Sequence, residues 1–374
     1  MSALTRPGAG AGEPVLEIRG LCVDYGRGGR ATRAVIDVDL TLHRGEVLGL
    51  AGESGSGKST LAYGATRLLR QPGIISGGSV LFRPSAARPD HVIDILDASP
   101  QTLRGLRWRD VALVFQSAMN SLNPVLRVEA QLTDTLAAHL PNSTKDERRE
   151  RAAGLLELVG ISPDRLRSFP HELSGGMKQR VMIALALALE PQVVLMDEPT
   201  TALDVVTQRQ IVEQVIGLRD RLGFSVLFIT HDVSLLIEMA DTIAIMYAGR
   251  IVESAPARRL FRAPRHPYTA ALLDSFPSLH GEPKVMAGIS GSPPDMRNPP
   301  AGCAFHPRCR YALPRCAQQI PELTSPAIRS DRRRLVACWL HEERELPDEL
   351  ARPEPDGQPR TPLPVAPESS GGPR

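Results

Sequence analysis

A glycine-rich loop that ends in a lysine and a serine is the clearest candidate for chemistry in this chain of 374 residues. The loop matches the pattern G-x-x-x-x-G-K-[ST], in which the glycines let successive backbone N–H groups face a phosphate. Lys58 would reach the β- and γ-phosphates of a nucleotide, and the Ser59 hydroxyl would ligate Mg²⁺. We therefore assign one nucleotide-binding segment, made of Gly52, Glu53, Ser54, Gly55, Ser56, Gly57, Lys58, Ser59 and Thr60.

Two adjacent carboxylates, Asp197 and Glu198, follow the apolar run Val193–Met196. Carboxylate oxygens are suitable ligands for Mg²⁺, so we expect Asp197 to hold the ion directly or through water. Glu198 could polarise an attacking water as a general base. The alternative is a plain acidic turn stopped by Pro199, and the apolar run before the pair argues against it.

A second helix start with uncovered backbone N–H groups lies within Leu173–Arg180. Ser174 is a good N-cap, Gly175 and Gly176 leave the first N–H groups open, and Gln179 follows on the same helix. The segment would bind an anion, or it is an ordinary Ser-Gly-Gly helix start. One nucleotide rarely needs two such sites in one chain, so a second anion site calls for an explanation.

The elements that position these residues form an α/β pattern with four short apolar runs, Val47–Ala51, Val111–Phe115, Val193–Met196 and Val226–Ile229. Runs of this length and composition predict buried parallel strands. Polar residues follow each of them in turn, namely the Gly52 loop, Gln116, the Asp197–Glu198 pair and the Thr230–Asp232 segment with His231. In an open α/β sheet ligands bind beyond the carboxyl ends of the strands, so we expect the four ends to converge on one pocket.

Helices are expected around these strands. One is predicted from Lys58 to Arg70, directly after the glycine-rich loop. A capping box at Thr144–Glu147 opens another, which Gly160 ends. A third begins near Ser174 and stops before Pro191, and an amphipathic helix over Ile211–Leu222 is closed by a glycine.

Four of the five cysteines lie together near the C-terminus, at Cys303, Cys309, Cys316 and Cys338, whereas Cys22 stands alone. The spacing C-x5-C-x6-C-x21-C lacks the C-x2-C pair usual in zinc ribbons. Four thiolates are what a [4Fe–4S] cluster requires, and we expect such a cluster here. Zinc, with His306 or His341 as a substitute ligand, and free thiols or disulfides remain the alternatives.

Composition bounds the classes of function and divides the chain. The net charge is +2 and aromatic residues make up 4%, so we expect no nucleic-acid partner. No apolar run is long enough to span a membrane, and no secretory signal is visible, so the chain is expected to be at most peripheral to a membrane. We expect a disordered N-terminus over 1–13, an α/β domain over 14–263 with a helical insert over about 117–190, an irregular extension over 264–346, and a disordered proline-rich tail over 347–374.

In the order of its motifs the chain resembles the ABC ATPase family over about 15–263. The motifs that match are Tyr25 (the aromatic residue that stacks on adenine), Gly52–Thr60 (Walker A), Gln116 (Q-loop), Leu173–Gln179 (signature), Val193–Glu198 (Walker B), Ala202–Asp204 (D-loop) and His231 (switch histidine). The resemblance implies an α/β P-loop NTPase (RecA-like) fold, an ABC nucleotide-binding domain with an antiparallel β subdomain and a helical subdomain, followed here by a small irregular extension that contains the cysteines.

The same resemblance implies a competent ATP site shared between two subunits. Mg²⁺ would be held through Ser59, Gln116 and Asp197, and the catalytic residues would be Glu198, His231 and Gln116. In the family two subunits pair head to tail, so the signature residues Ser174, Gly175, Gly176 and Gln179 would contact the ATP bound by the partner subunit. This arrangement explains two anion sites in one chain. The partner would be a second, similar ATPase chain or another copy of this one.

Two further segments are similar to the ATP-binding subunits of dipeptide and oligopeptide importers. One is the extended Q-loop Ser117–Pro124; the other is a C-terminal extension with the motifs His266–Thr269, Pro293–Asp295 and Gly302–Cys309. The resemblance implies an importer ATPase on the cytoplasmic face of the cell membrane, with two permease subunits and an extracytoplasmic solute-binding protein, and some members carry an iron–sulfur cluster in this extension. The alternatives are an importer of nickel, glutathione or another small solute, or a non-transport ABC regulator.

Overall fold

The computed structural model describes residues 12–26, 31–84, 90–116, 121–201, 203–275, 288–325, 334–342, 347 and 350. The disorder predicted for the two ends of the chain therefore lies almost wholly outside the described residues. So do Ser117–Asn120 of the predicted Q-loop and Ala202 of the predicted D-loop.

The centre of the structure is a seven-stranded sheet with the order β11-β10-β9-β3-β8-β7-β6. The strands are β3 (Val47–Ala51), β6 (Val111–Val114), β7 (Val193–Asp197), β8 (Ser225–Ile229), β9 (Thr242–Tyr247), β10 (Arg250–Pro256) and β11 (Leu335–Val336). The four predicted apolar runs are the adjacent parallel strands β3, β8, β7 and β6, which confirms that part of the fold. Every residue of these four strands is buried, which explains why their sequences do not alternate between apolar and polar residues.

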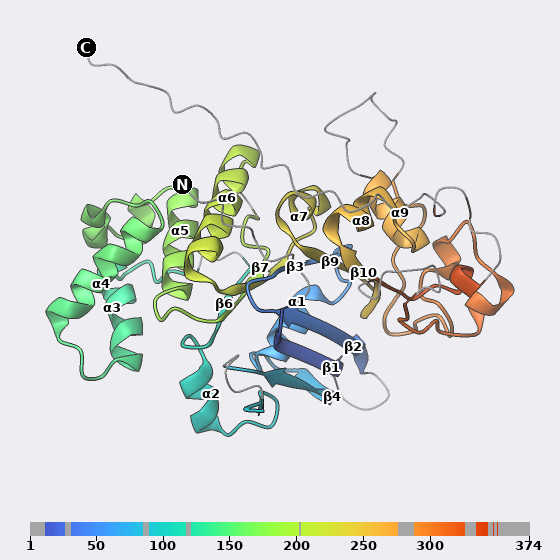
Figure 1. Ribbon diagram of the computed structural model, residues 1–374, viewed down its shortest axis with the longest axis horizontal. Coiled ribbons are helices and arrows are strands. Elements are labelled where there is room, and N and C mark those ends of the chain that lie inside the picture. The colour runs from blue at the N-terminus through green and yellow to red at the C-terminus, as the bar shows by residue number, and fades with distance from the viewer. Residues whose placement is uncertain are drawn as a thin grey trace, which may run out of the picture.

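A second, antiparallel sheet packs on one face of the first and confirms the predicted β subdomain. Its order is β2-β1-β4-β5, with β1 at Pro14–Tyr25, β2 at Thr32–His43, β4 at Gly73–Phe82 and β5 at Ile93–Asp94. Leu48 and Leu50 of β3 belong to the core on this face, whereas Val47 and Ala51 belong to the core on the other. In Figure 1 the antiparallel sheet lies below the main sheet, and helices α5 to α8 lie above it.

The helices cover the sheets and form the helical subdomain. They are α1 (Lys58–Ala65), α2 (Pro100–Leu106), α3 (Val128–His139), α4 (Lys145–Leu158), α5 (Gly175–Ala186), α6 (Val205–Leu222), α7 (Val233–Met239), α8 (Ala257–Arg262) and α9 (Pro267–Asp274). The predicted capping box opens α4, where Thr144 and Glu147 exchange both hydrogen bonds. No helix in the described part of the chain is long and apolar enough to cross a membrane.

Helix α1 is shorter than the predicted Lys58–Arg70, because it ends at Ala65. Arg67 has a left-handed backbone with φ 52°. Its guanidinium donates to the carbonyl of Ala98 at 2.7 Å and to that of Ile95 at 3.3 Å. These contacts replace the next helical turn, and they depend on residues about thirty positions away, which a local pattern does not reveal.

The C-terminal extension is irregular, as predicted, and it also joins the main sheet. It contains α9 and the 3₁₀ turns His306–Arg308, Pro314–Ala317 and Trp339–Glu342. The short strand β11 pairs antiparallel with β10, with Glu253 opposite Val336. Glu253 is fully buried and accepts hydrogen bonds from the backbone N–H groups of Arg265 and His266. The extension is thus anchored on the α/β domain through β10 (Figure 1).

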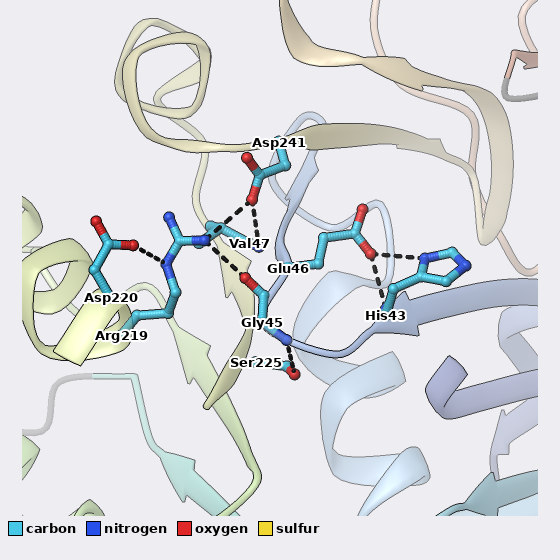
Figure 2. Close-up of polar contacts among 8 residues, drawn as sticks. All are labelled: His43, Gly45, Glu46, Val47, Arg219, Asp220, Ser225 and Asp241. Carbon is cyan, nitrogen blue, oxygen red and sulfur yellow. Dashed lines mark hydrogen bonds and ion pairs between the residues drawn. The ribbon is translucent and has the colours of Figure 1, made fainter. Parts of the chain in front are cut away.

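A polar network fixes the beginning of β3, the strand that leads to the glycine-rich loop (Figure 2). Arg219, in the last turn of α6, donates to the carbonyl of Gly45 at 2.7 Å and lies 3.5 Å from a carboxylate oxygen of Asp241. The same Asp241 oxygen accepts from the N–H of Val47 at 2.9 Å. Arg219 is 8% exposed, so this contact ties β3 to α6 and β9 in a mostly dry environment.

Candidate functional site

The glycine-rich loop joins β3 to α1, and two of its glycines have no room for a side chain. Gly52 has φ 152°, and a Cβ atom there would lie 2.1 Å from the carbonyl oxygen of Met246. Gly57 has φ 107°, and its Cβ would lie 2.4 Å from the carbonyl oxygen of Ala34. The loop therefore packs closely against the neighbouring backbone. Because glycine has no side chain, the backbone N–H groups at these two positions stay open to a ligand.

Lys58 is the cation of this loop, and its side chain is buried, at 5% exposure. The ammonium donates to the carbonyls of Gly52 and Glu53, both at 2.9 Å. Burial lowers the pKa of Lys58, and the nearby charges of Glu198, Asp197 and Glu53 oppose that shift. Among the described residues no carboxylate forms an ion pair with it, so its charge is available to an anion such as a phosphate.

Ser59 and Asp197 meet across the ends of β3 and β7. The Ser59 hydroxyl donates to Oδ1 of Asp197 at 2.9 Å. The other carboxylate oxygen, Oδ2, is buried and has no hydrogen-bond partner in the described part of the chain. Burial raises the pKa of Asp197, and the Ser59 hydrogen bond opposes the shift. A buried carboxylate oxygen without a partner, beside a hydroxyl, fits a hard divalent cation such as Mg²⁺.

Glu198 receives contacts from two other strand ends. Its Oε2 accepts from the Gln116 amide and from the Thr201 hydroxyl, both at 3.0 Å. Nδ1 of His231 lies 3.4 Å from its Oε1, and the His231 side chain is 61% exposed. Glu198 also has a left-handed backbone, with φ 45°, the kind of local strain that is common at functional sites. The carboxylate is thus oriented by its neighbours, as a general base must be.

The structure therefore brings the ends of β3, β6, β7 and β8 together, as the sequence predicts. Tyr25 ends β1, and its hydroxyl lies 3.3 Å from the Thr60 hydroxyl on α1, which places the aromatic ring beside the glycine-rich loop. The described residues do not test whether Gln116 ligates Mg²⁺ or whether Tyr25 stacks on adenine, so both roles stay predictions.

The signature residues lie at the start of α5, and no hydrogen bond among the described residues joins them to the glycine-rich loop of the same chain. Ser174 caps the helix by accepting from the N–H of Met177 at 3.3 Å. Gly176 lies against α6, where a Cβ atom would come within 2.8 Å of a Thr207 methyl group. Gln179 is buried on the same helix, at 2% exposure. The start of α5 could therefore bind an anion other than the one held by the glycine-rich loop of the same chain.

Two residues of the extension contact the glycine-rich loop, and no local sequence pattern predicts this contact. The hydroxyl of Tyr268 accepts from the N–H of Glu53 at 2.8 Å. Arg308 forms a two-pronged ion pair with the Glu53 carboxylate, at 2.7 and 3.0 Å. Both residues lie in motifs that the sequence analysis singled out, His266–Thr269 and Gly302–Cys309, but nothing in those motifs indicates a partner more than two hundred positions away.

The four clustered cysteines line one small hollow in the extension, together with His266 and His306. All five cysteines of the chain are free thiols in the structure. Burial raises the pKa of Cys303 to about 11 and that of Cys338 to about 12, with smaller contributions from the other thiols. In the described part of the chain, no three His, Cys, Asp or Glu side chains are arranged to hold a metal ion. The thiols thus gather around one hollow, but the described residues are not arranged as a metal site.

Comparisons with known proteins agree with this geometry. Residues 35–201 match the family model "ABC transporter", and residues 252–316 match "Oligopeptide/dipeptide transporter, C-terminal region". The dipeptide transport ATP-binding protein DppD of Caldanaerobacter subterraneus is 40% identical over 312 residues, which cover 83% of this chain and 92% of that protein. The oligopeptide transport ATP-binding protein OppD of Bacillus subtilis is 40% identical over 331 residues, which cover 87% and 88%.

A solved structure supports the fold independently. The ATP-binding cassette MJ0796, in a dimeric post-hydrolysis state with ADP and phosphate, superposes with a TM-score of 0.56 at 27% identity, over 65% of this chain and 99% of that one. The relatives and the strand-end geometry point to the same chemistry. The chain belongs to the ABC transporter family and is one of its ATP-hydrolysing, ATP-binding proteins.

Proposed function

We propose that this chain is the ATPase subunit of an importer of di- or oligopeptides, docked on the cytoplasmic face of the cell membrane. The names of the relatives support the solute class, and the match of residues 252–316 to the oligopeptide transporter region supports it as well. The observation that carries the ATPase role is the contact of Ser59 with Asp197 and of Gln116 and His231 with Glu198 at one sheet edge.

The residues divide the work of hydrolysis. Lys58 and the loop N–H groups bind the β- and γ-phosphates and offset their charge. Ser59 and Asp197 would hold Mg²⁺, which when bound neutralises charge on the transferring phosphoryl group. Glu198 accepts a proton from water, while Gln116 and Thr201 keep its carboxylate in place. His231, exposed beside Glu198, would contact the γ-phosphate.

A second ATPase subunit completes the site in this proposal. The helix start at Ser174 presents N–H groups that the chain's own loop does not use, so it would bind the ATP held by the partner. The dimeric state of MJ0796 is consistent with such pairing. The partner is a similar ATPase chain or another copy of this one, and two permease subunits and a solute-binding protein form the rest of the complex.

ATP binding would close the dimer, and this movement would be transmitted to the permease. Gln116 follows β6, at the point where the chain leaves the main sheet for the helical subdomain. Its amide donates a 3.0 Å hydrogen bond to Glu198. A helix of the permease would dock in a groove near this segment. ATP-dependent closure would then move that helix, since the subdomain and the ATP site are joined at Gln116.

The test is purification of the tagged full chain from its native membrane. We expect two permease subunits, a second ATPase subunit and a solute-binding protein to be recovered with it. ATP hydrolysis by this complex should rise when loaded binding protein and di- or oligopeptides are added. Stimulation by nickel or glutathione alone would replace the peptide assignment. Recovery with a soluble partner and no permease would favour the non-transport regulator.

We further propose that Cys303, Cys309, Cys316 and Cys338 ligate a [4Fe–4S] cluster. Such a cluster takes four thiolates and holds them further apart than a single ion does, because iron and sulfide lie between them. The four thiols around one hollow support this ligand set. Zinc, with His306 or His341 as a substitute ligand, stays the alternative. The cluster would staple a segment that has little apolar core of its own.

Anaerobic purification of the full chain tests the cluster. We expect a brown protein with visible absorption and about four irons and four sulfides per chain. Cys316→Ser should lose most of the iron, while Cys22→Ser, which changes the one cysteine outside the hollow, should keep it. A colourless wild-type protein that takes up no iron on reconstitution would leave the thiols free or, if zinc is recovered, would assign the site to zinc.

A further inference from the structure

The C-terminal extension holds one residue of the ATP-binding loop at two points. The N–H of Glu53 donates to the Tyr268 hydroxyl, and its carboxylate accepts two hydrogen bonds from Arg308. Lys58 holds the same residue from inside the loop, through the Glu53 carbonyl. Glu53 is therefore fixed by its backbone and by its side chain, and two of its partners, Tyr268 and Arg308, come from beyond the ATPase core.

Arg308 is a built-in partner and not a surface charge that happens to lie near. Its side chain is 5% exposed, against 24% for Glu53. Besides the carboxylate, its guanidinium donates to the hydroxyl of Tyr247 at 3.2 Å and to the carbonyl of Ser290 at 2.9 Å. Two parallel hydrogen bonds in a partly desolvated position give a defined geometry, which most exposed ion pairs lack.

The charge of Glu53 has an effect on the ATP site. Glu53 is a carboxylate in a loop that must bind a polyanion, and its charge acts on the Lys58 ammonium. An unpaired carboxylate here would repel the triphosphate and would compete with it for Lys58. The Arg308 guanidinium neutralises the carboxylate and directs it toward the extension.

We propose that Arg308 is a positioning residue of the ATP site, which neutralises Glu53 and anchors the loop in its phosphate-binding form. The extension is then a working part of the ATP site, and its loss or displacement weakens ATP binding. This inference rests on ATP binding alone and does not depend on the solute or on the cysteine site.

A double-mutant cycle on the full chain tests the inference, with Mg-ATP as the probe in equilibrium binding. Arg308→Gln should weaken Mg-ATP binding about tenfold, because Glu53 is left charged and unpaired. Glu53→Gln should bind Mg-ATP more tightly than Arg308→Gln, because it leaves no unpaired negative charge in the loop to repel the triphosphate. The decisive protein is the double variant, which should bind like Glu53→Gln and so restore the loss.

Restoration is specific to the charge, because a merely structural role of Arg308 would not be repaired by a second substitution. Arg310→Gln, which removes an exposed cation two residues along, is the matched control and should bind as wild type. If the double variant binds as weakly as Arg308→Gln, or if Arg308→Gln binds as wild type, the inference is wrong. Should Arg308→Gln not fold, Arg308→Lys keeps the charge without the paired hydrogen bonds. If Arg308→Lys weakens Mg-ATP binding tenfold, and adding Glu53→Gln to it does not restore binding, the inference is equally wrong.

Discussion

Replacing Glu198 by glutamine separates the chemistry of this residue from its structural contacts. In the structure Oε2 accepts from Gln116 and Thr201, both at 3.0 Å. The carbonyl oxygen of a new amide can accept both hydrogen bonds, and its NH₂ group then faces Nδ1 of His231. The free energy of unfolding should therefore change by less than about 1 kcal/mol. The amide cannot take a proton from water, so general-base catalysis is lost.

Loss of a general base reduces turnover by about 100- to 10,000-fold, or about 3 to 5 kcal/mol in activation free energy. We expect Mg-ATP binding within about threefold of wild type, and an ATP-dependent dimer that persists in size analysis with the right partner. The assay is steady-state phosphate release with parallel ATP binding. Glu157→Gln, an exposed position on α4, is the control and should hydrolyse ATP normally. Turnover within tenfold of wild type would refute the base assignment.

Two further substitutions test the loop and the sheet that carries it. Gly57→Ala would place a Cβ atom 2.4 Å from the Ala34 carbonyl oxygen, so Mg-ATP binding should be lost. Gly55→Ala is the control, because there is open space around that position and only the backbone strain at φ 78° would destabilise the loop. Isothermal titration measures ATP binding by both variants, and thermal unfolding measures their stability. Normal ATP binding by Gly57→Ala would refute the close packing of the loop. Arg219→Met removes the guanidinium from Gly45 and Asp241 and should lower the free energy of unfolding by about 3 kcal/mol in urea titrations. Arg221→Met, in the same helical turn, is its control, and equal stability of the two variants would mean that the network in Figure 2 contributes little.

Much of the core could be predicted from local sequence because its signals are local. The apolar runs of β3, β6, β7 and β8 are buried on both faces, and such runs need no alternation to be recognised. The capping box at Thr144 and the left-handed Gly223 that ends α6 can each be recognised from two to four neighbouring residues. The meeting of four strand ends follows from the topology of a parallel sheet, so it too could be expected.

The rest depends on contacts between distant parts of the chain. Helix α1 stops at Ala65 because Arg67 turns toward carbonyls near position 98, and no periodicity in 58–70 records that. The contact of Arg308 with Glu53 joins residues 255 positions apart. Its residues looked like parts of a separate extension, and only the packing of that extension against β10 brings them to the ATP site.

Peptide uptake by cells is the most direct test of the central conclusion that ATP hydrolysis by this chain drives an importer. A strain that lacks the chain would be supplied with wild type, with Lys58→Ala, or with Lys145→Ala, which removes an exposed lysine at the start of α4. Uptake of labelled di- and oligopeptides should be restored by wild type and by Lys145→Ala, and not by Lys58→Ala, because a phosphate site without its buried cation cannot offset the triphosphate charge. Equal uptake with Lys58→Ala and wild type, or normal peptide uptake in the strain without the chain, would contradict the account.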